Sequence, residues 1–149
     1  MDEKDRKILS LLQQNATYSA AEIAEQVGLS TTPCWRRIQK LEAQGYIKSR
    51  VALLDHRMMN VGTTVFVHVR TSRHAGDWLT RFTETVRQMP EIVEAHRLSG
   101  DVDYLLRIVV PDIAEYDRVY KRLIRKLDFL DISSSFAMEE IKSTTMLPI

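Results

Sequence analysis

The sequence predicts an α+β chain in two parts, because its hydrophobic periodicity changes once along the 149 residues. Up to about residue 47, apolar side chains recur at the three- and four-residue spacing of amphipathic helices. From Val51 onward, strand-like segments alternate with helical ones in the order βαββαβ. We therefore expect three N-terminal helices followed by a domain with the split βαβ, or ferredoxin-like, arrangement.

The first two helices are defined by their apolar faces and by their ends. The first helix places three aliphatic side chains on one face: Ile8, Leu11 and Leu12. The second begins at Ser19-Ala-Ala-Glu22, a capping box in which serine and glutamate satisfy two free backbone donors. It ends at Gly28, since glycine is the usual residue just past the end of a helix.

A third helix is expected after the Gly-Leu-Ser turn at residues 28–30. Ser30 or Thr31 can cap it, and Pro33 is tolerated in its first turn, where the missing N–H costs little. Two helices, a glycine turn and a third helix make the helix-turn-helix pattern. Residues 45–51, which follow, can add a turn and a small strand as a wing.

The second part is expected to contain four strands and two helices. The strands are expected over residues 64–70, 93–98, 104–110 and 132–141. The helices are expected over residues 75–89 and 112–127. The chain is accordingly divided into a winged helix-turn-helix domain, a hinge strand with linker, and a ferredoxin-like domain, over residues 1–50, 51–62 and 63–149.

Composition narrows the class of protein. Hydrophobic residues make up 44 % and charged residues 28 %, as in globular proteins. No run approaches the roughly 20 apolar residues that span a bilayer, and no signal-peptide pattern follows the charged N-terminus. The single cysteine excludes an internal disulfide. We therefore expect a cytoplasmic protein with no membrane partner.

Basic side chains are concentrated on and after the third helix. Residues 28–50 hold five cations against one acid, Glu42, whereas the whole chain has a net charge of only +1. At about 100° per residue, Thr32, Arg36 and Lys40 lie opposite the apolar stripe of this helix. Cations and hydroxyls so placed favour double-stranded DNA as a partner over a merely solvated surface. The candidate DNA-binding residues are Ser30, Thr31, Thr32, Pro33, Trp35, Arg36, Arg37 and Lys40.

Two residues of the third helix have competing interpretations. Trp35 lies at the edge of the apolar stripe, where we expect it to pack against the first helix, with DNA contact as the alternative. Cys34 lies within the stripe. We expect it to act as a small apolar residue and not as a redox switch.

Asp101 and Asp103 follow a glycine between two expected strands, in Leu-Ser-Gly-Asp-Val-Asp-Tyr. Such a pair can end a hairpin turn, hold a metal, act in catalysis or bind an amine. A metal site or a catalytic site would need further side chains beside the two aspartates. None is well placed, because Glu139 and Glu140 point to opposite faces of a strand and the histidines are scattered. We expect no catalytic residue, no metal site and no cofactor. Two interpretations remain. The segment is a structural hairpin turn, or it is a turn that also binds an amino acid through its carboxylates and exposed N–H groups.

Four segments resemble the Lrp/AsnC, or feast/famine, family of transcription regulators. They are Asp5-Arg-Lys-Ile-Leu9, Gly28-Leu-Ser-Thr-Thr-Pro-Cys-Trp-Arg-Arg37, Lys40-Leu-Glu-Ala-Gln-Gly-Tyr-Ile47 and Gly100-Asp-Val-Asp-Tyr-Leu-Leu106. The resemblance extends over essentially the whole chain, and the closing residues 134–149 look most like the branch of cysteine-responsive detoxification regulators. It implies a sequence-specific DNA-binding regulator, not an enzyme, whose second domain forms homodimers that assemble into octamers.

The resemblance also implies an amino-acid effector bound between dimers. It carries that site over to residues of the hairpin turn and the last strand: Ser99, Gly100, Asp101, Val102, Asp103, Tyr104, Ser134, Ser135 and Phe136. Leucine-responsive members often carry bulkier residues in that strand, so the two serines here leave room for a smaller or more polar effector than leucine. The resemblance to the cysteine-responsive branch implies cysteine or another small amino acid. An architectural DNA-binding protein without an effector is the alternative. Which aspartate meets the ligand stays open.

Overall fold

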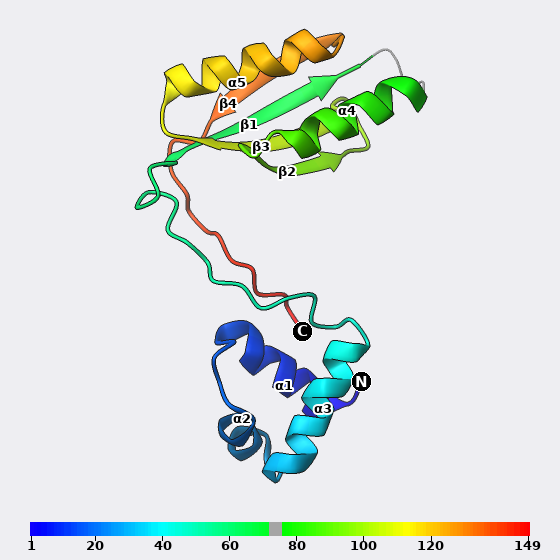
Figure 1. The fold of residues 1–149 in the computed structure, drawn as a ribbon, viewed down its shortest axis with the longest axis vertical. Coiled ribbons are helices and arrows are strands. Elements are labelled where there is room, and N and C mark those ends of the chain that lie inside the picture. Colours follow the sequence, from blue (N-terminus) through cyan, green and yellow to red (C-terminus); the bar gives the residue numbers. More distant parts are fainter. Residues whose placement is uncertain (72–75) are drawn as a thin grey trace. The chain divides into compact units, whose positions relative to one another are not determined.

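The computed structural model describes residues 1–71 and 76–149, and these residues form two compact units (Figure 1). The first unit comprises Met1–Leu53 together with Ile141–Ile149, and the second comprises Leu54–Glu140. The expected sheet domain ran to the end of the chain, whereas in the structure its last residues lie with the helical unit. Each unit has its own hydrophobic core and is described by itself.

The first unit is built from three helices: α1 (Glu3–Gln14), α2 (Ala20–Val27) and α3 (Thr31–Ala43). The capping box predicted before α2 is present, since the Ser19 side chain accepts from the N–H of Glu22 and the Glu22 side chain accepts from the N–H of Ser19. Gly28 follows α2 in the left-handed conformation, with φ of 64°, which costs glycine no clash with a Cβ. The apolar faces meet in one core of Ile8, Leu12, Ile23, Ala24, Val27, Cys34, Ile38 and Leu41.

The segment after α3 forms no strand within this chain. Residues 44–62, all of which the structure describes, adopt turns and irregular backbone. The small wing strand expected after Gly45 needs a neighbour for its backbone N–H and C=O groups, and the sheet of the second unit does not include this segment. Several of its aliphatic side chains are exposed, Leu53 by 72 % and Leu54 by 70 %.

The second unit is an antiparallel sheet with two helices on one face (Figure 1). Its strands, in the spatial order β2-β3-β1-β4, are β1 (Thr63–Arg70), β2 (Ile92–Arg97), β3 (Tyr104–Val110) and β4 (Asp131–Phe136). Its helices are α4 (Gly76–Gln88) and α5 (Ile113–Lys126). The predicted order βαββαβ is confirmed. The predicted start of α4 at Ala75 lies outside the described residues.

β4 is shorter than predicted, ending at Phe136 and not at Ile141. Among the described strands its one neighbour is β1, which begins at Thr63. Phe136 is paired with Val65, and the N–H of Ala137 donates to the carbonyl of Thr64 at 2.9 Å. Beyond that point β1 offers no further backbone groups, so the ladder stops there.

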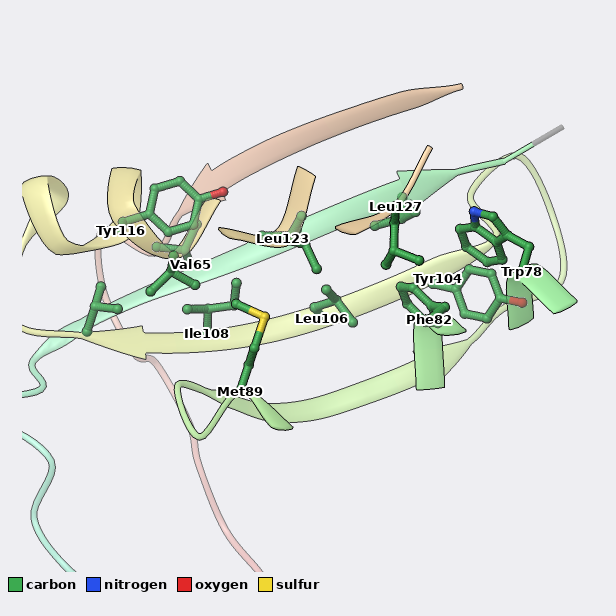
Figure 2. Close-up of a cluster of buried hydrophobic side chains, with 14 residues drawn as sticks. Val65, Trp78, Phe82, Met89, Tyr104, Leu106, Ile108, Tyr116, Leu123 and Leu127 are labelled. Atoms are coloured by element: carbon green, nitrogen blue, oxygen red, sulfur yellow. The ribbon is translucent and has the colours of Figure 1, made fainter. Parts of the chain in front are cut away.

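The core of the second unit lies between the sheet and the two helices, as Figure 2 shows. Alternate residues of β1 and β3 point into it. From α4 come Trp78 and Phe82, whose rings stack with centroids 5.0 Å apart. From α5 come Tyr116 and Leu123, which cover the same face (Figure 2). Both helices therefore pack on the same face of the sheet.

On the other face of the sheet, the described part of the chain places no helix. Its half-buried side chains on the two central strands include Phe66, His68, Leu105 and Arg107. The Arg107 guanidinium is paired there with Glu94 at 2.7 Å. Among the described residues, no helix is both long and apolar enough to cross a bilayer.

Candidate functional site

One line of side chains runs along the outward face of α3. Thr32, Arg36 and Lys40 are spaced by four residues and are all exposed, so they lie one above the other on one side of the helix. The buried residues of α3 are Cys34, Ile38 and Leu41, as expected. Within the described part of the chain, Arg36 and Lys40 make no ion pair and no side-chain hydrogen bond. Both cations are therefore directed to the surroundings.

Arg37, the next residue along, is engaged within the protein. Its Nη1 contacts the carboxylate of Asp2 at 2.7 Å and that of Asp5 at 2.7 Å. The N–H of Asp5 and then the Arg37 guanidinium lower the pKa of the Asp2 carboxyl. The N–H of Asp2 and then the same guanidinium lower the pKa of Asp5. Arg37 thus ties α3 to the N-terminus of α1, and its geometry separates it from Arg36 and Lys40.

The first turn of α3 is left with free hydrogen-bonding groups. Ser30 occupies the N-cap position with extended backbone, but its side chain makes no capping hydrogen bond. Thr31, Thr32 and Pro33 are exposed beside it. The first N–H groups of a helix have no intrahelical acceptor and carry partial positive charge. The start of α3 therefore presents hydroxyl groups and backbone donors outward.

Trp35 is more exposed than its place at the edge of the apolar stripe suggested. It lies outside the core of this unit and 52 % of its surface is exposed, so its packing against the first helix stays a prediction. The neighbouring inward position is filled by Cys34, which is fully buried. Burial raises the pKa of the Cys34 thiol, which fits the role of a small apolar core residue.

The basic segment is partly neutralised by the fold. Of its five cations, Arg37 is paired as described, and Arg50 contacts Glu42 at 2.8 Å. Within the described residues, Arg36, Lys40 and Lys48 keep no carboxylate partner. The excess positive charge of this segment is thereby concentrated on the outer side of α3 and just after it.

The two aspartates of the β2–β3 hairpin have different environments. The Asp103 carboxylate accepts from the N–H of Thr71 at 2.8 Å. Its backbone is held on both sides, since its N–H donates to the carbonyl of Val69 at 3.0 Å and its carbonyl accepts from Leu98 N–H at 2.8 Å. Asp101 is exposed at the tip of the turn. Asp103 therefore shapes the turn, and Asp101 is the aspartate open to solvent.

Gly100 makes this turn possible. Its φ of 127° is one that residues with a Cβ rarely adopt. It lies between Ser99 and Asp101, and all three are exposed. Among the described residues, the N–H groups of Gly100, Asp101 and Val102 have no hydrogen-bond partner in the protein. The turn therefore offers a carboxylate together with nearby backbone donors.

The residues expected on β4 point to two different faces. Ser134 faces the helices, where its hydroxyl is hydrogen-bonded to that of Tyr116. Phe136 faces the same way and packs edge-on against the Tyr116 ring, with centroids 5.2 Å apart. Ser135 lies on the other face, paired with Phe66. Of these three residues, only Ser135 lies on the helix-free face of the sheet.

The hairpin residues and the β4 residues are not brought together within one chain. On β1, Val69 pairs with Tyr104 at the hairpin end, whereas Val65 pairs with Phe136 at the opposite end. Ser134 lies beside a groove of about 260 Å³ between α5 and β4, lined by Ile113, Tyr116, Asp117, Tyr120, Ile132 and Ser134. The hairpin turn is not part of this groove.

Two contacts of the first unit were missed in the sequence. The carboxylates of Asp2 and Asp5 form a capping box at the start of α1, a pattern that the spacing of the two acids could have revealed. The side chain of Gln13 bonds the backbone of Leu147, 134 residues away. No local signal predicts that contact. Among the described residues, no group of three or more potential metal-ligating side chains is found.

A helix-turn-helix unit joined to a separate α+β domain defines a class of DNA-binding regulators that carry their own sensor domain. A winged helix-turn-helix DNA-binding domain matches residues 1–48, and the Lrp/AsnC ligand binding domain matches residues 64–147. This chain belongs to the Lrp/AsnC family of transcription regulators.

Relatives support that assignment over the full length. The glutamate uptake regulatory protein of Zymomonas mobilis is 50 % identical over 149 residues, covering 100 % of this chain and 91 % of that protein. The DNA-binding transcriptional activator DecR of Escherichia coli is 47 % identical over 150 residues, covering 100 % of this chain and 99 % of that protein. The crystal structure of a transcriptional regulator from Neisseria meningitidis in complex with L-Met is 37 % identical, with a TM-score of 0.94 over 99 % of this chain and 96 % of that one.

Proposed function

We propose that this regulator binds double-stranded DNA through the outer face of α3, with Arg36 and Lys40 as the main contacts. The observation that carries the proposal is the contrast between Arg36 and Lys40, which have no protein partner among the described residues, and Arg37, which two carboxylates hold. A guanidinium can pair with the O6 and N7 of guanine, and an ammonium with phosphate. Ser30, Thr31, Thr32 and Pro33 line the start of the helix, where backbone N–H groups suit a phosphate.

The second unit, in this proposal, binds a small amino acid. Asp101 takes the ammonium group of the ligand, and the N–H groups of the turn around Gly100 take its carboxylate. A ligand of this class is supported by the L-Met complex of the Neisseria relative. Cysteine or another small amino acid is the effector proposed for this chain, because serines occupy the last strand.

The effector site is completed by a second copy of the chain. The hairpin turn and Ser134–Phe136 lie at opposite ends of β1, so a ligand that meets both sets needs residues of two chains. The helix-free face of the sheet supports self-association, because a half-buried face with Phe66 and Leu105 is favourable to cover. We propose homodimers that assemble into octamers and act on DNA in the cytoplasm. Native mass spectrometry of the full chain tests the subunit number.

A thermal-shift screen of the twenty amino acids tests the sensor function. A ligand that binds only the folded state must raise the melting temperature, by an amount that grows with its concentration. We expect a rise with at least one small amino acid. No rise with any of them, combined with salt-dependent DNA binding, would favour the architectural alternative. If the protein showed no salt-dependent affinity for DNA at all, the proposed DNA-binding function would be refuted.

A further inference from the structure

Gln13, in the last turn of α1, holds the C-terminal segment on the helical unit. Its Nε2 donates to the carbonyl of Leu147 at 2.9 Å, and its Oε1 accepts from the N–H of Leu147 at 2.8 Å. One side-chain amide thereby satisfies both backbone polar groups of one residue. The arrangement reproduces the double hydrogen bond that paired residues exchange in an antiparallel ladder.

The tail is shaped for this contact by its own backbone. The Leu147 side chain is 67 % exposed, so the contact rests on its N–H and carbonyl groups and not on side-chain packing. Pro148 follows, and a residue before proline is biased toward the extended conformation in which both groups are presented. The N–H of Met146 donates to the Thr144 hydroxyl at 3.1 Å, a local contact just before Leu147.

The other end of the same segment is fixed to the sheet. Ala137 donates to the carbonyl of Thr64 at 2.9 Å, directly after the last residue of β4. Between the two fixed ends the chain is unpacked, with Met138 exposed by 96 % and Ile141 by 91 %. Residues 137–149 therefore form a strap that begins at β4 and ends at α1.

We propose that this strap is a clasp through which the effector domain biases the DNA-binding unit. The inference rests on the proposed function, because Ser134–Phe136 of the proposed effector site continue directly into the strap. An effector can shift an equilibrium only by binding its two states unequally. The two states here are the strap held by Gln13 and the strap released from it. Water competes for both hydrogen bonds at this accessible position, which keeps the clasp reversible.

The test compares variants on both sides of the contact in the full-length chain. Gln13→Ala removes the side-chain amide, and Leu147→Pro removes the donor N–H while α1 stays unchanged. Gln14→Ala is the matched control, since Gln14 is the adjacent exposed glutamine and its side chain has no hydrogen-bond partner among the described residues. L-methionine and each of the other amino acids serve as probes, added singly. The readouts are the melting shift, the operator affinity with and without the amino acid, and hydrogen exchange of residues 8–14.

We expect wild type and Gln14→Ala to change operator affinity when the amino acid binds, by the roughly 5- to 150-fold typical of allosteric coupling. In Gln13→Ala and Leu147→Pro the melting shift should persist, while the ratio of operator affinities falls to near one and residues 8–14 stop responding. If both variants keep the full ratio, the clasp is overturned and the effector function stands.

A different result separates the two proposals. If no amino acid shifts the melting temperature of the wild type, the proposed sensor function fails. Hydrogen exchange without added amino acid then tests the clasp. Faster exchange of residues 8–14 and 141–149 in Gln13→Ala than in Gln14→Ala supports it. Equal exchange in the two variants overturns it.

Discussion

The outer face of α3 and the proposed effector residues differ in how far a single chain completes them. On α3, Thr32, Arg36 and Lys40 share one side of one helix, and each is exposed. The effector residues are divided between the hairpin turn and the end of β4, which the register of β1 holds apart. The first site is thus set by local geometry, whereas the proposed second site depends on strand register and, in the assembly that we propose, on a second chain.

This difference teaches which property each site depends on. A helix face follows from a rise of about 1.5 Å and 100° per residue, so spacing in the sequence is enough to define it. A site across a sheet depends on which strands are neighbours and on their alignment, and shifting a strand by one residue reverses every side chain. Variants on the outward line of α3, at Thr32, Arg36 and Lys40, should therefore act on DNA affinity alone, and variants in the hairpin should divide into stability and binding effects.

The largest effect is expected from Arg36→Ala. If Arg36 reads a base edge, its loss should weaken operator affinity by about 1–3 kcal/mol, roughly 5- to 150-fold, and relax specificity at one position. Fluorescence anisotropy with a duplex selected from random sequences measures this at fixed salt. Arg6→Ala is the control, because it removes an exposed arginine from α1. If both variants lost the same operator affinity, Arg36 would contribute only its positive charge and not a base contact.

Substitutions of Asp101 and Asp103 should have different effects, one on ligand binding and the other on stability. Asp103→Ala removes the charged acceptor of the Thr71 N–H, so we expect the free energy of unfolding to fall by about 1–3 kcal/mol. Asp101→Ala should leave the melting temperature of the free protein unchanged, because Asp101 is exposed. It should abolish the melting shift caused by the amino acid that stabilises the wild type. A normal ligand-induced shift in Asp101→Ala would remove Asp101 from the effector site.

Lys40→Ala should have a smaller and less specific effect. A phosphate contact weakens binding nearly equally for all sequences and contributes about 1 to the slope of log affinity against log salt. Operator and random duplexes titrated at several salt concentrations measure that slope. Lys7→Ala, at an exposed position of α1, controls for the loss of one positive charge. A change of base preference in Lys40→Ala would contradict the phosphate assignment.

The accuracy of sequence-based prediction in this chain follows the range of the interactions. Helical spacing predicted that Cys34, Ile38 and Leu41 are buried, and they are. It could not reveal that Asp2 and Asp5 neutralise Arg37, because those acids lie 35 and 32 residues away in the chain. The exposure of Trp35 was also missed, since a position at the edge of an apolar stripe is decided by how closely the neighbouring helix approaches.

The sheet shows the same limit. The strands and their order along the chain followed from periodicity, but the end of β4 depends on where β1 begins. Ser134 and Ser135 illustrate the consequence, because they are adjacent in the sequence but face opposite sides of the sheet. The sequence could therefore name the effector residues by resemblance without indicating that one chain keeps them apart.

The smallest effect is expected from Arg37→Ala, and it should appear in stability instead of DNA affinity. The pKa values of Asp2 and Asp5 are lowered in the folded protein, so the stability they contribute is present above their unfolded value near 3.8 and is lost as the pH falls through the lower folded values. The variant should melt slightly below the wild type at neutral pH, and the gap should close below about pH 4.

Thermal melts of both full-length proteins between pH 7 and pH 3 measure this gap, with Arg36→Ala as the control that should show none. Operator affinity at pH 7 should be nearly unchanged in Arg37→Ala, because its guanidinium is bound to the two carboxylates in the folded protein. A loss of affinity as large as that of Arg36→Ala, without a change in melting temperature, would mean that Arg37 leaves the carboxylates when DNA binds. The outward line on α3 would then include a third cation.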